Sequence, residues 1–156
     1  MRTLLLLLVS VVSVGVSCRS DAMAPLDAAV VQITVAPGTV ISGDTVHLAV
    51  TLANPTSGRL RLQPASVCYL DFEVLDSAAV RVGWSTAGCI AIVPGAIELA
   101  PRGSRRQDFT WHARTCGPEG LCVDAAPGRY SVRGLVHILG RNPLRSVGVP
   151  LQVSVW

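Results

Sequence analysis

The stretch TVHLAVTLANPTSG, Thr45–Gly58, carries the pattern that decides the fold class of this chain. Apolar side chains stand at every second position, at Val46, Leu48, Val50 and Leu52. A period of two is typical of a β-strand with one buried and one solvated face. The cluster Asn54–Gly58 is rich in turn-forming residues and ends the strand. The stretch therefore predicts a half-buried strand followed by a turn.

The same pattern recurs along most of the 156 residues. It predicts strands at residues 30–35, 45–52, 60–64, 69–75, 80–84, 90–93, 96–99, 106–113, 130–139 and 147–155. No segment shows a 3.6-residue apolar period with helix caps. Short strands that Gly and Pro turns separate, without crossover helices, predict an all-β, antiparallel β-sandwich. Pro150 lacks an N–H for the ladder, which places the last strand at or near an edge.

Composition narrows the class of protein further. Half of the residues are hydrophobic and only 15% are charged, which excludes a disordered chain. The length suits one domain. All 13 basic residues are Arg, and they are scattered apart from the run at residues 102–106. Because there is no basic stripe with interleaved aromatic residues, we expect no nucleic-acid binding.

The N-terminus predicts export. Arg2 precedes an apolar run of thirteen residues, Leu4–Val16. A membrane-spanning helix needs about 20 apolar residues, so the run fits a signal peptide better. Two cleavage sites compete: one before Cys18, and one after the Ala-Met-Ala sequence that ends at Ala24. The first follows the apolar run directly and resembles the lipobox of bacterial lipoproteins, although Gly15 stands where Leu is usual.

The number of cysteines favours the site before Cys18. Five cysteines leave one unpaired in an oxidising compartment, and a lipid on Cys18 removes the odd one. The remaining four are Cys68, Cys89, Cys116 and Cys122. We therefore predict a lipoprotein-type signal peptide at 1–17, lipidation at Cys18, a tether at 18–29 and a β-sandwich domain at 30–156.

Four segments resemble the BsuPI-type intracellular proteinase inhibitor domain in their order. They are Asn54-Pro55-Thr56, DFEVLDSAAVRVGWS (Asp71–Ser85), LAPRGSRRQDFTW (Leu99–Trp111) and APGRYSVRGLV (Ala126–Val136). The resemblance spans roughly residues 43–136. It implies a small immunoglobulin-like β-sandwich, here of about 7–9 strands. The added cysteines and the export signal depart from this family's pattern.

The resemblance also implies structural roles for several residues. Asp71 is expected to point outward and Phe72 inward, while Trp84 and Trp111 are expected to be large core anchors. The turn at residues 127–128 leads into a strand that carries Tyr130. All of these residues determine the fold, and none is an inhibitory contact. The family's activity is therefore only an alternative function.

The segment CGPEGLC, Cys116–Cys122, predicts a disulfide-closed loop. Zinc sites usually space their cysteines two to four residues apart and need further ligands, whereas five residues separate these two. By elimination Cys68 pairs with Cys89, although four cysteines allow three pairings. The loop is expected to protrude. Such a loop either carries a binding surface or is merely stiffened by its bridge.

No catalytic or metal-binding motif is present in the sequence. His47, His112 and His137 lie in separate predicted strands, outside any metal-binding pattern. Asp71 and Glu73 share one face of a strand, for which a solvated face is a better interpretation than a cation site. There is no nucleophile elbow and no phosphate loop. We therefore predict no enzyme activity, no cofactor and no metal.

Together these observations predict an exported, lipid-anchored, non-catalytic interaction module of the bacterial cell envelope. Its partners would be the membrane, through the lipid at Cys18, and an unidentified protein or protease. A proteinase inhibitor is the alternative, and an envelope enzyme or metal binder ranks lowest.

Overall fold

The computed structural model confirms an all-β fold. It describes residues 22–85, 92–117 and 120–155. Within these ranges the chain forms fourteen strands and one 3-10 turn, η1 (Leu26–Ala28). The number of strands exceeds the predicted 7–9, which is the number found in immunoglobulin domains. The excess arises because six of the fourteen strands are only two or three residues long.

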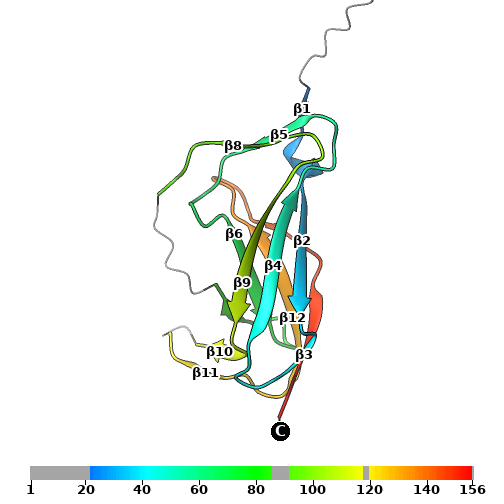
Figure 1. The fold of residues 1–156 in the computed structure, drawn as a ribbon. Coiled ribbons are helices and arrows are strands. Elements are labelled where there is room, and N and C mark those ends of the chain that lie inside the picture. The colour runs from blue at the N-terminus through cyan, green and yellow to red at the C-terminus, as the bar shows by residue number, and fades with distance from the viewer. Residues whose placement is uncertain (1–21, 86–91, 118–119, 156) are drawn as a thin grey trace, which may run out of the picture.

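Two sheets pack face to face as a sandwich (Figure 1). One has the order β2 (Val30–Ala36), β4 (Val46–Ala53) and β9 (Ser104–Trp111). The other has the order β3 (Thr39–Ile41), β14 (Val149–Ser154), β12 (Gly128–Val136), β6 (Leu70–Leu75) and β7 (Arg81–Trp84), with β13 (Leu144–Arg145) also beside β12. This is an immunoglobulin-like arrangement, in which the chain passes repeatedly between the two sheets: β2, β4 and β9 lie in one, and the segments between and after them add β3, β6, β7 and β12–β14 to the other.

Smaller elements close the two ends of the sandwich (Figure 1). At one end, β1 (Met23–Ala24), β5 (Arg59–Leu62) and β8 (Ile97–Leu99) form a small sheet. We call this region, residues 22–29, 54–62, 97–103 and 138–142, the β1 end. At the other end, β10 (Arg114–Cys116) and β11 (Cys122–Asp124) form a hairpin. We call β10, β11 and residues 42–45, 76–81 and 125–129 the hairpin end.

The strand that the opening stretch predicts lies at the centre of its sheet. β4 pairs with β2 on one side and with β9 on the other. The four alternating apolar side chains are all buried in the core, at Val46, Leu48, Val50 and Leu52. Ala49 is buried as well, although it lies on the opposite face of the strand. A central strand covered by a second sheet explains why the alternation is so regular.

The Asn54 side chain holds together the turns that follow β4. Its Nδ2 donates hydrogen bonds to the carbonyls of Gly58 at 2.8 Å and Ala100 at 3.0 Å. Its Oδ1 accepts from the backbone N–H of Thr56 at 3.1 Å and from the Thr56 hydroxyl at 2.7 Å. Asn54 is only 1% exposed, so these bonds replace water that cannot reach it. The Asn54-Pro55-Thr56 motif is therefore a structural element of the turn.

Three of the proposed anchors are buried. Phe72 packs edge-on against Phe109, with ring centroids 5.4 Å apart, and Trp111 packs against Tyr130 at 6.1 Å. The Tyr130 hydroxyl donates to the carbonyl of Ala126 at 2.7 Å. A tyrosine that bonds back to the chain just before its own strand is the tyrosine corner of immunoglobulin-like sandwiches.

Trp84 is not a core residue, contrary to the prediction. Its partner across β6 and β7 is Glu73, whereas Gly83 lies opposite Val74. Because neighbouring residues in a strand point to opposite faces, Trp84 lies on the outer face when Gly83 points inward. The Arg81 guanidinium lies over the Trp84 ring, 5.1 Å from its centroid.

The predicted strands differ from the observed ones mainly in short segments. The pattern does not predict β1, β3, β10, β11 or β13, which are too short to show a period. The strand expected at 90–93 is wrong for Ile92 and Val93, which are in no strand, while residues 90–91 lie outside the described ranges. The β1–β5 and β3–β14 pairings are parallel. β14 lies next to the edge strand β3, which confirms that the last strand is near an edge.

Part of the predicted tether belongs to the domain. Met23 and Ala24 pair with Arg59 and Leu60 of β5. Leu26, in the η1 turn, packs against the core. The ordered domain thus includes residues 22–29, and Cys18 lies outside the described part of the chain. In that part, no helix has the length and the apolar character that a bilayer span requires.

Candidate functional site

The hairpin β10–β11 is closed by a disulfide between Cys116 and Cys122, as the sequence predicts. The two cysteines lie directly opposite each other in the antiparallel ladder. Beyond them the N–H of Gly117 donates to the carbonyl of Leu121 at 2.9 Å. The bridge and this hydrogen bond hold the two arms of the hairpin in one register.

Backbone hydrogen bonds fasten the base of the hairpin to the sandwich. The carbonyl of Ala113 accepts from the N–H groups of Ala125 at 2.7 Å and Gly43 at 3.3 Å. The Ser42 hydroxyl donates to the carbonyl of Ala125 at 2.6 Å. Ala113 has a φ of 43°, in the left-handed region, where β9 turns into β10. The hairpin is thus a rigid projection of the domain.

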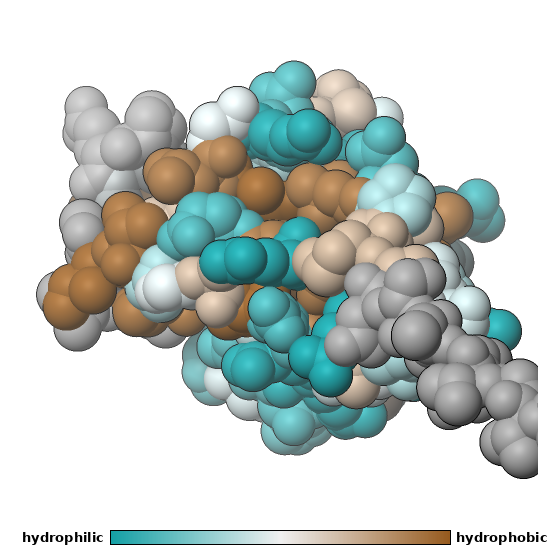
Figure 2. All heavy atoms as spheres, turned by 90° about the horizontal axis from the view of Figure 1, so that it is seen from above, coloured by the Kyte–Doolittle hydropathy of each residue, from teal (hydrophilic) through white to brown (hydrophobic). Residues whose placement is uncertain are grey.

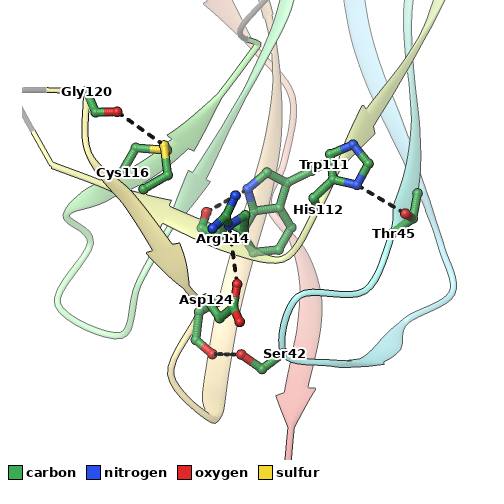
Figure 3. A network of polar contacts seen from close by, with 10 residues as sticks. Ser42, Thr45, Trp111, His112, Arg114, Cys116, Gly120 and Asp124 are labelled. Carbon is green, nitrogen blue, oxygen red and sulfur yellow. Dashed lines mark hydrogen bonds and ion pairs between the residues drawn. A yellow bond between two sulfur atoms is a disulfide. The ribbon is translucent and has the colours of Figure 1, made fainter.

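Side-chain contacts reinforce the same base (Figure 3). The indole Nε1 of Trp111 donates to the carbonyl of Arg114 at 3.0 Å. The Arg114 guanidinium lies 3.2 Å from the Asp124 carboxylate, an ion pair that joins β10 to β11. Both of its side chains are about half exposed, so its contribution to stability is small. Its main effect is to orient the two arms.

The hairpin presents apolar side chains to solvent. Leu121 is 74% exposed and Val123 is 64% exposed. These positions are two residues apart on one arm, so their side chains point to the same face. A single exposed apolar residue is ordinary, but two on one face of a stapled projection form a contact surface.

A pocket of about 180 Å³ lies beside the base of the hairpin. It is lined by Gly83, Trp84, Trp111, His112, Arg114 and the Cys116–Cys122 disulfide, among others. Gly83 is required here, because a Cβ at this position would lie 2.8 Å from Trp111 Nε1. The pocket thus combines indole walls with basic side chains at its rim. It can hold an apolar side chain of a partner.

Two further side chains at the hairpin end, His112 and Tyr130, have hydrogen-bond partners. His112 Nδ1 lies 3.1 Å from the Thr45 hydroxyl. Burial, and secondarily the negative charge of Asp76, raises the pKa of the Tyr130 hydroxyl above its ordinary value. Tyr130 therefore stays protonated and remains a donor to Ala126 across the neutral range.

The acidic residues of β6 do not form the solvated face that the sequence suggested. Glu73 is only 7% exposed, and its carboxylate lies 3.5 Å from Arg145 Nε. The Asp71 carboxylate lies 3.4 Å from His137 Nε2. Arg145 lies on β13 and His137 directly after β12, so these basic partners come from segments distant in the sequence, which pattern analysis of one strand does not detect.

The other predicted site residues are placed as follows. Cys68 is disulfide-bonded, while its predicted partner Cys89 lies outside the described residues, as does Cys18. His47 is exposed on the outer face of β4, as predicted. Across residues 22–85, 92–117 and 120–155, no three His, Cys, Asp or Glu side chains gather closely enough to hold a metal ion.

Sequence reasoning identified the hairpin but missed its pocket. Trp84 and Trp111 stand 27 residues apart in the sequence. They line one cavity because β10 packs against β7 at this end. A cavity between distant strands leaves no local pattern.

No protein-family model matches this chain. No curated protein matches it in sequence. Similar solved structures include a β-glucosidase from Erythrobacter marinus, with 11% identity, a TM-score of 0.49, and coverage of 81% of this chain and 15% of that one. The alkylpurine DNA glycosylase AlkC from Pseudomonas fluorescens is similar at 16% identity and a TM-score of 0.49, covering 82% of this chain and 31% of that one.

The sporulation control protein Spo0M from Bacillus subtilis has 14% identity and a TM-score of 0.49, covering 83% of this chain and 50% of that one. This chain therefore spans half or less of the length of these three proteins. Similarity at this level carries no information on function.

Proposed function

We propose that this protein is an exported, lipid-anchored β-sandwich without catalytic activity, which binds a protein partner in the cell envelope through its disulfide hairpin. One observation carries the proposal. The hairpin is a stapled projection that exposes Leu121 and Val123 on one face, while the disulfide on its other face lines a pocket together with Trp84 and Trp111. Well-packed pockets with aromatic walls and apolar anchors are where binding energy concentrates in protein interfaces.

The cysteines support an extracytoplasmic compartment. Stable structural disulfides occur mainly in exported proteins, because cytosolic reductants keep thiols reduced. The Cys116–Cys122 bridge is consistent with an oxidising, extracytoplasmic location. The disulfide at Cys68 agrees with the same location.

The pairing of β1 supports processing before Cys18. Cleavage at the competing site, after Ala24, would remove Met23 and Ala24, which pair with β5. It would also remove the Ala22 carbonyl, which accepts from the Arg59 N–H at 3.1 Å. Processing before Cys18 retains all of these contacts, and it leaves the cysteine at the new N-terminus for lipidation.

Membrane fractionation with intact-mass measurement tests the anchor. The wild type is expected in the membrane fraction, with the mass of the chain from Cys18 plus acyl groups. Cys18→Ser should appear in the soluble fraction, and the matched control Ser20→Ala should behave as the wild type. Membrane retention and an unchanged mass in Cys18→Ser would show that the anchor is wrong.

Photo-crosslinking in cells tests the binding surface. A photoreactive amino acid at Leu121 is expected to give one discrete crosslinked product. The matched control position is Val147, which is 88% exposed and lies outside the hairpin end. Val123→Ser in the same chain should abolish the product at 121. Equal products at both positions, or none at 121, would argue against the hairpin as the binding surface.

A proteinase inhibitor is the alternative, supported by the sequence resemblance and by the stapled, exposed loop that carries Leu121. Such a loop fits a protease cleft in an extended conformation. Stoichiometric inhibition of a protease in a panel assay, lost in Leu121→Gly, would favour this alternative. Absence of inhibition at micromolar concentration would remove it.

A further inference from the structure

The β1 end has a surface composition of its own. Its exposed apolar side chains are Met23, 53% exposed, and Leu139, 52% exposed. Its charged residues are four arginines and two acids, at Arg59, Arg61, Arg102, Arg141, Asp27 and Glu98. Figure 2 looks onto this end and shows apolar surface interleaved with strongly hydrophilic side chains. The surface is therefore mixed in character and cationic in balance.

Ion pairs leave part of this positive charge available. Arg59 lies 3.9 Å from Glu98, and Arg141 lies 3.8 Å from Asp27. All four of these side chains are about half exposed or more, so water screens both pairs strongly. The two acids offset only half of the positive charge of the four arginines. The hairpin end, by contrast, carries three arginines and three acids, at Arg81, Arg114, Arg129, Asp44, Asp76 and Asp124.

The length of chain before the domain limits where this end can lie. Three residues separate Cys18 from Ala22, the first residue bonded to β5. Four extended residue steps reach at most about 14 Å. If Cys18 carries a lipid, as the proposed function holds, the β1 end cannot leave the immediate neighbourhood of the bilayer.

We propose that the β1 end is a membrane-facing surface that rests on the headgroups of an anionic phospholipid bilayer. Arginines near such a surface are attracted to it, and exposed apolar side chains such as Met23 and Leu139 can enter the interface. Because a lipid anchor holds the β1 end in place, even weak attraction fixes the orientation of the domain.

This orientation determines where the hairpin lies. The two ends of the domain are separated by the length of β4, which has eight residues. At about 3.3 Å per residue, the hairpin end is held roughly 25 Å beyond the β1 end. The hairpin then points away from the membrane, toward soluble partners or toward partners that project from the opposite side.

Paramagnetic broadening in lipid nanodiscs tests the inference. The acylated wild-type chain, labelled with ¹⁵N, is placed in nanodiscs of phosphatidylcholine and phosphatidylglycerol that contain a gadolinium headgroup lipid. Amides of Met23, Arg59 and Arg102 should broaden most, and those of Val123 and Asp124 least. In pure phosphatidylcholine the contrast between the two ends should shrink.

Charge variants separate attraction from tethering. The test variant replaces three arginines of the β1 end by glutamine: R61Q, R102Q and R141Q. The matched control makes the same charge change at the hairpin end: R81Q, R114Q and R129Q. Each arginine lost from the β1 end should lower the population of the docked state about five-fold. The test variant should therefore lose the contrast between the ends, and the control should keep it.

Two outcomes overturn the inference, and they are distinguishable. Uniform broadening in an acylated wild-type chain, or the strongest broadening at the hairpin, would refute the membrane-facing surface while leaving the anchor intact. A mass that shows no acyl group at Cys18 would refute the anchor itself, and the inference that rests on it. A contrast in the wild type that only the test variant loses supports the proposal.

Discussion

Replacing Asn54 by alanine tests how the turns after β4 are held together. The substitution removes two donors, to Gly58 and Ala100, and the acceptor of the Thr56 N–H. Each bond is worth about 1 kcal/mol net, and more where the remaining group is buried without a partner. We therefore expect Asn54→Ala to lower the free energy of unfolding by about 3–4 kcal/mol. That is a large part of the roughly 5–15 kcal/mol typical of a domain.

Urea unfolding followed by tryptophan fluorescence measures this loss. The midpoint should fall while the slope m stays constant, because the same surface is exposed on unfolding. Thr56→Val removes only the hydroxyl that donates to Asn54 Oδ1 at 2.7 Å, so it should cost about 1 kcal/mol. Asn142→Ala, at an exposed position, should stay within about 0.5 kcal/mol of the wild type.

A second substitution distinguishes hydrogen bonding from packing. Asn54→Asp keeps the shape of the side chain but turns a carboxylate oxygen toward the carbonyls of Gly58 and Ala100. Asn54→Asp should destabilise the domain at least as much as Asn54→Ala does. The carboxylate oxygen would face the two carbonyl oxygens with no hydrogen atom between them to make a hydrogen bond. A loss below about 1 kcal/mol for Asn54→Ala, or an Asp variant as stable as the wild type, would refute the reasoning.

Three further predictions concern the hairpin end. Gly83→Ala should lower the free energy of unfolding by about 1–3 kcal/mol in urea titration, because the new Cβ would lie 2.8 Å from Trp111 Nε1; an unchanged midpoint would mean that the indole moves freely. Tyr130→Phe should cost about 1 kcal/mol at neutral pH through the lost bond to Ala126. The raised pKa of Tyr130 means that the native state holds this proton more tightly than the unfolded chain does. The resulting stabilisation is complete below the ordinary tyrosine pKa of 10.0 and is lost as pH rises through the higher pKa of the folded state. The wild type should therefore lose more stability than Tyr130→Phe when urea midpoints are compared on either side of that pH, and parallel profiles would contradict this. The double variant C116S/C122S should lose at most about 2.4 kcal/mol by the chain-entropy model for a loop of this size. Its hydrogen exchange should rise at residues 114–117 and 122–124 before it rises in β4, and the opposite order would show that the bridge supports the core.

The sequence pattern predicted the sandwich well where strands are long. β4, β14 and the first part of β12 follow the alternation because one face of each is buried against the other sheet. A disulfide between two cysteines close in sequence can also be predicted, and the Cys116–Cys122 bridge is an example. Phe72 and Trp111 were correctly placed in the core by the resemblance.

The sequence was less informative where a residue's environment comes from distant strands. Trp84 was expected in the core from the resemblance, yet the register of β7 against β6 turns it outward. Glu73 was expected in solvent because it is charged, yet Arg145 lies beside it on β13 and the carboxylate is buried. Residue type predicts average burial, and only pairing determines the face.

The sequence by itself determined the fold class, through its period of two, and the disulfide-closed hairpin, through two cysteines close together. It also determined the turn that ends the strand of the opening stretch. All three are properties of residues near one another in the chain. Tertiary structure alone decided three other features: the pocket between Trp84 and Trp111, the docking of β1 on β5, and the placement of the hairpin opposite the β1 end. The physical reason is the same in each case. Contacts between residues far apart in the chain depend on strand register and sheet packing, which a single segment does not encode.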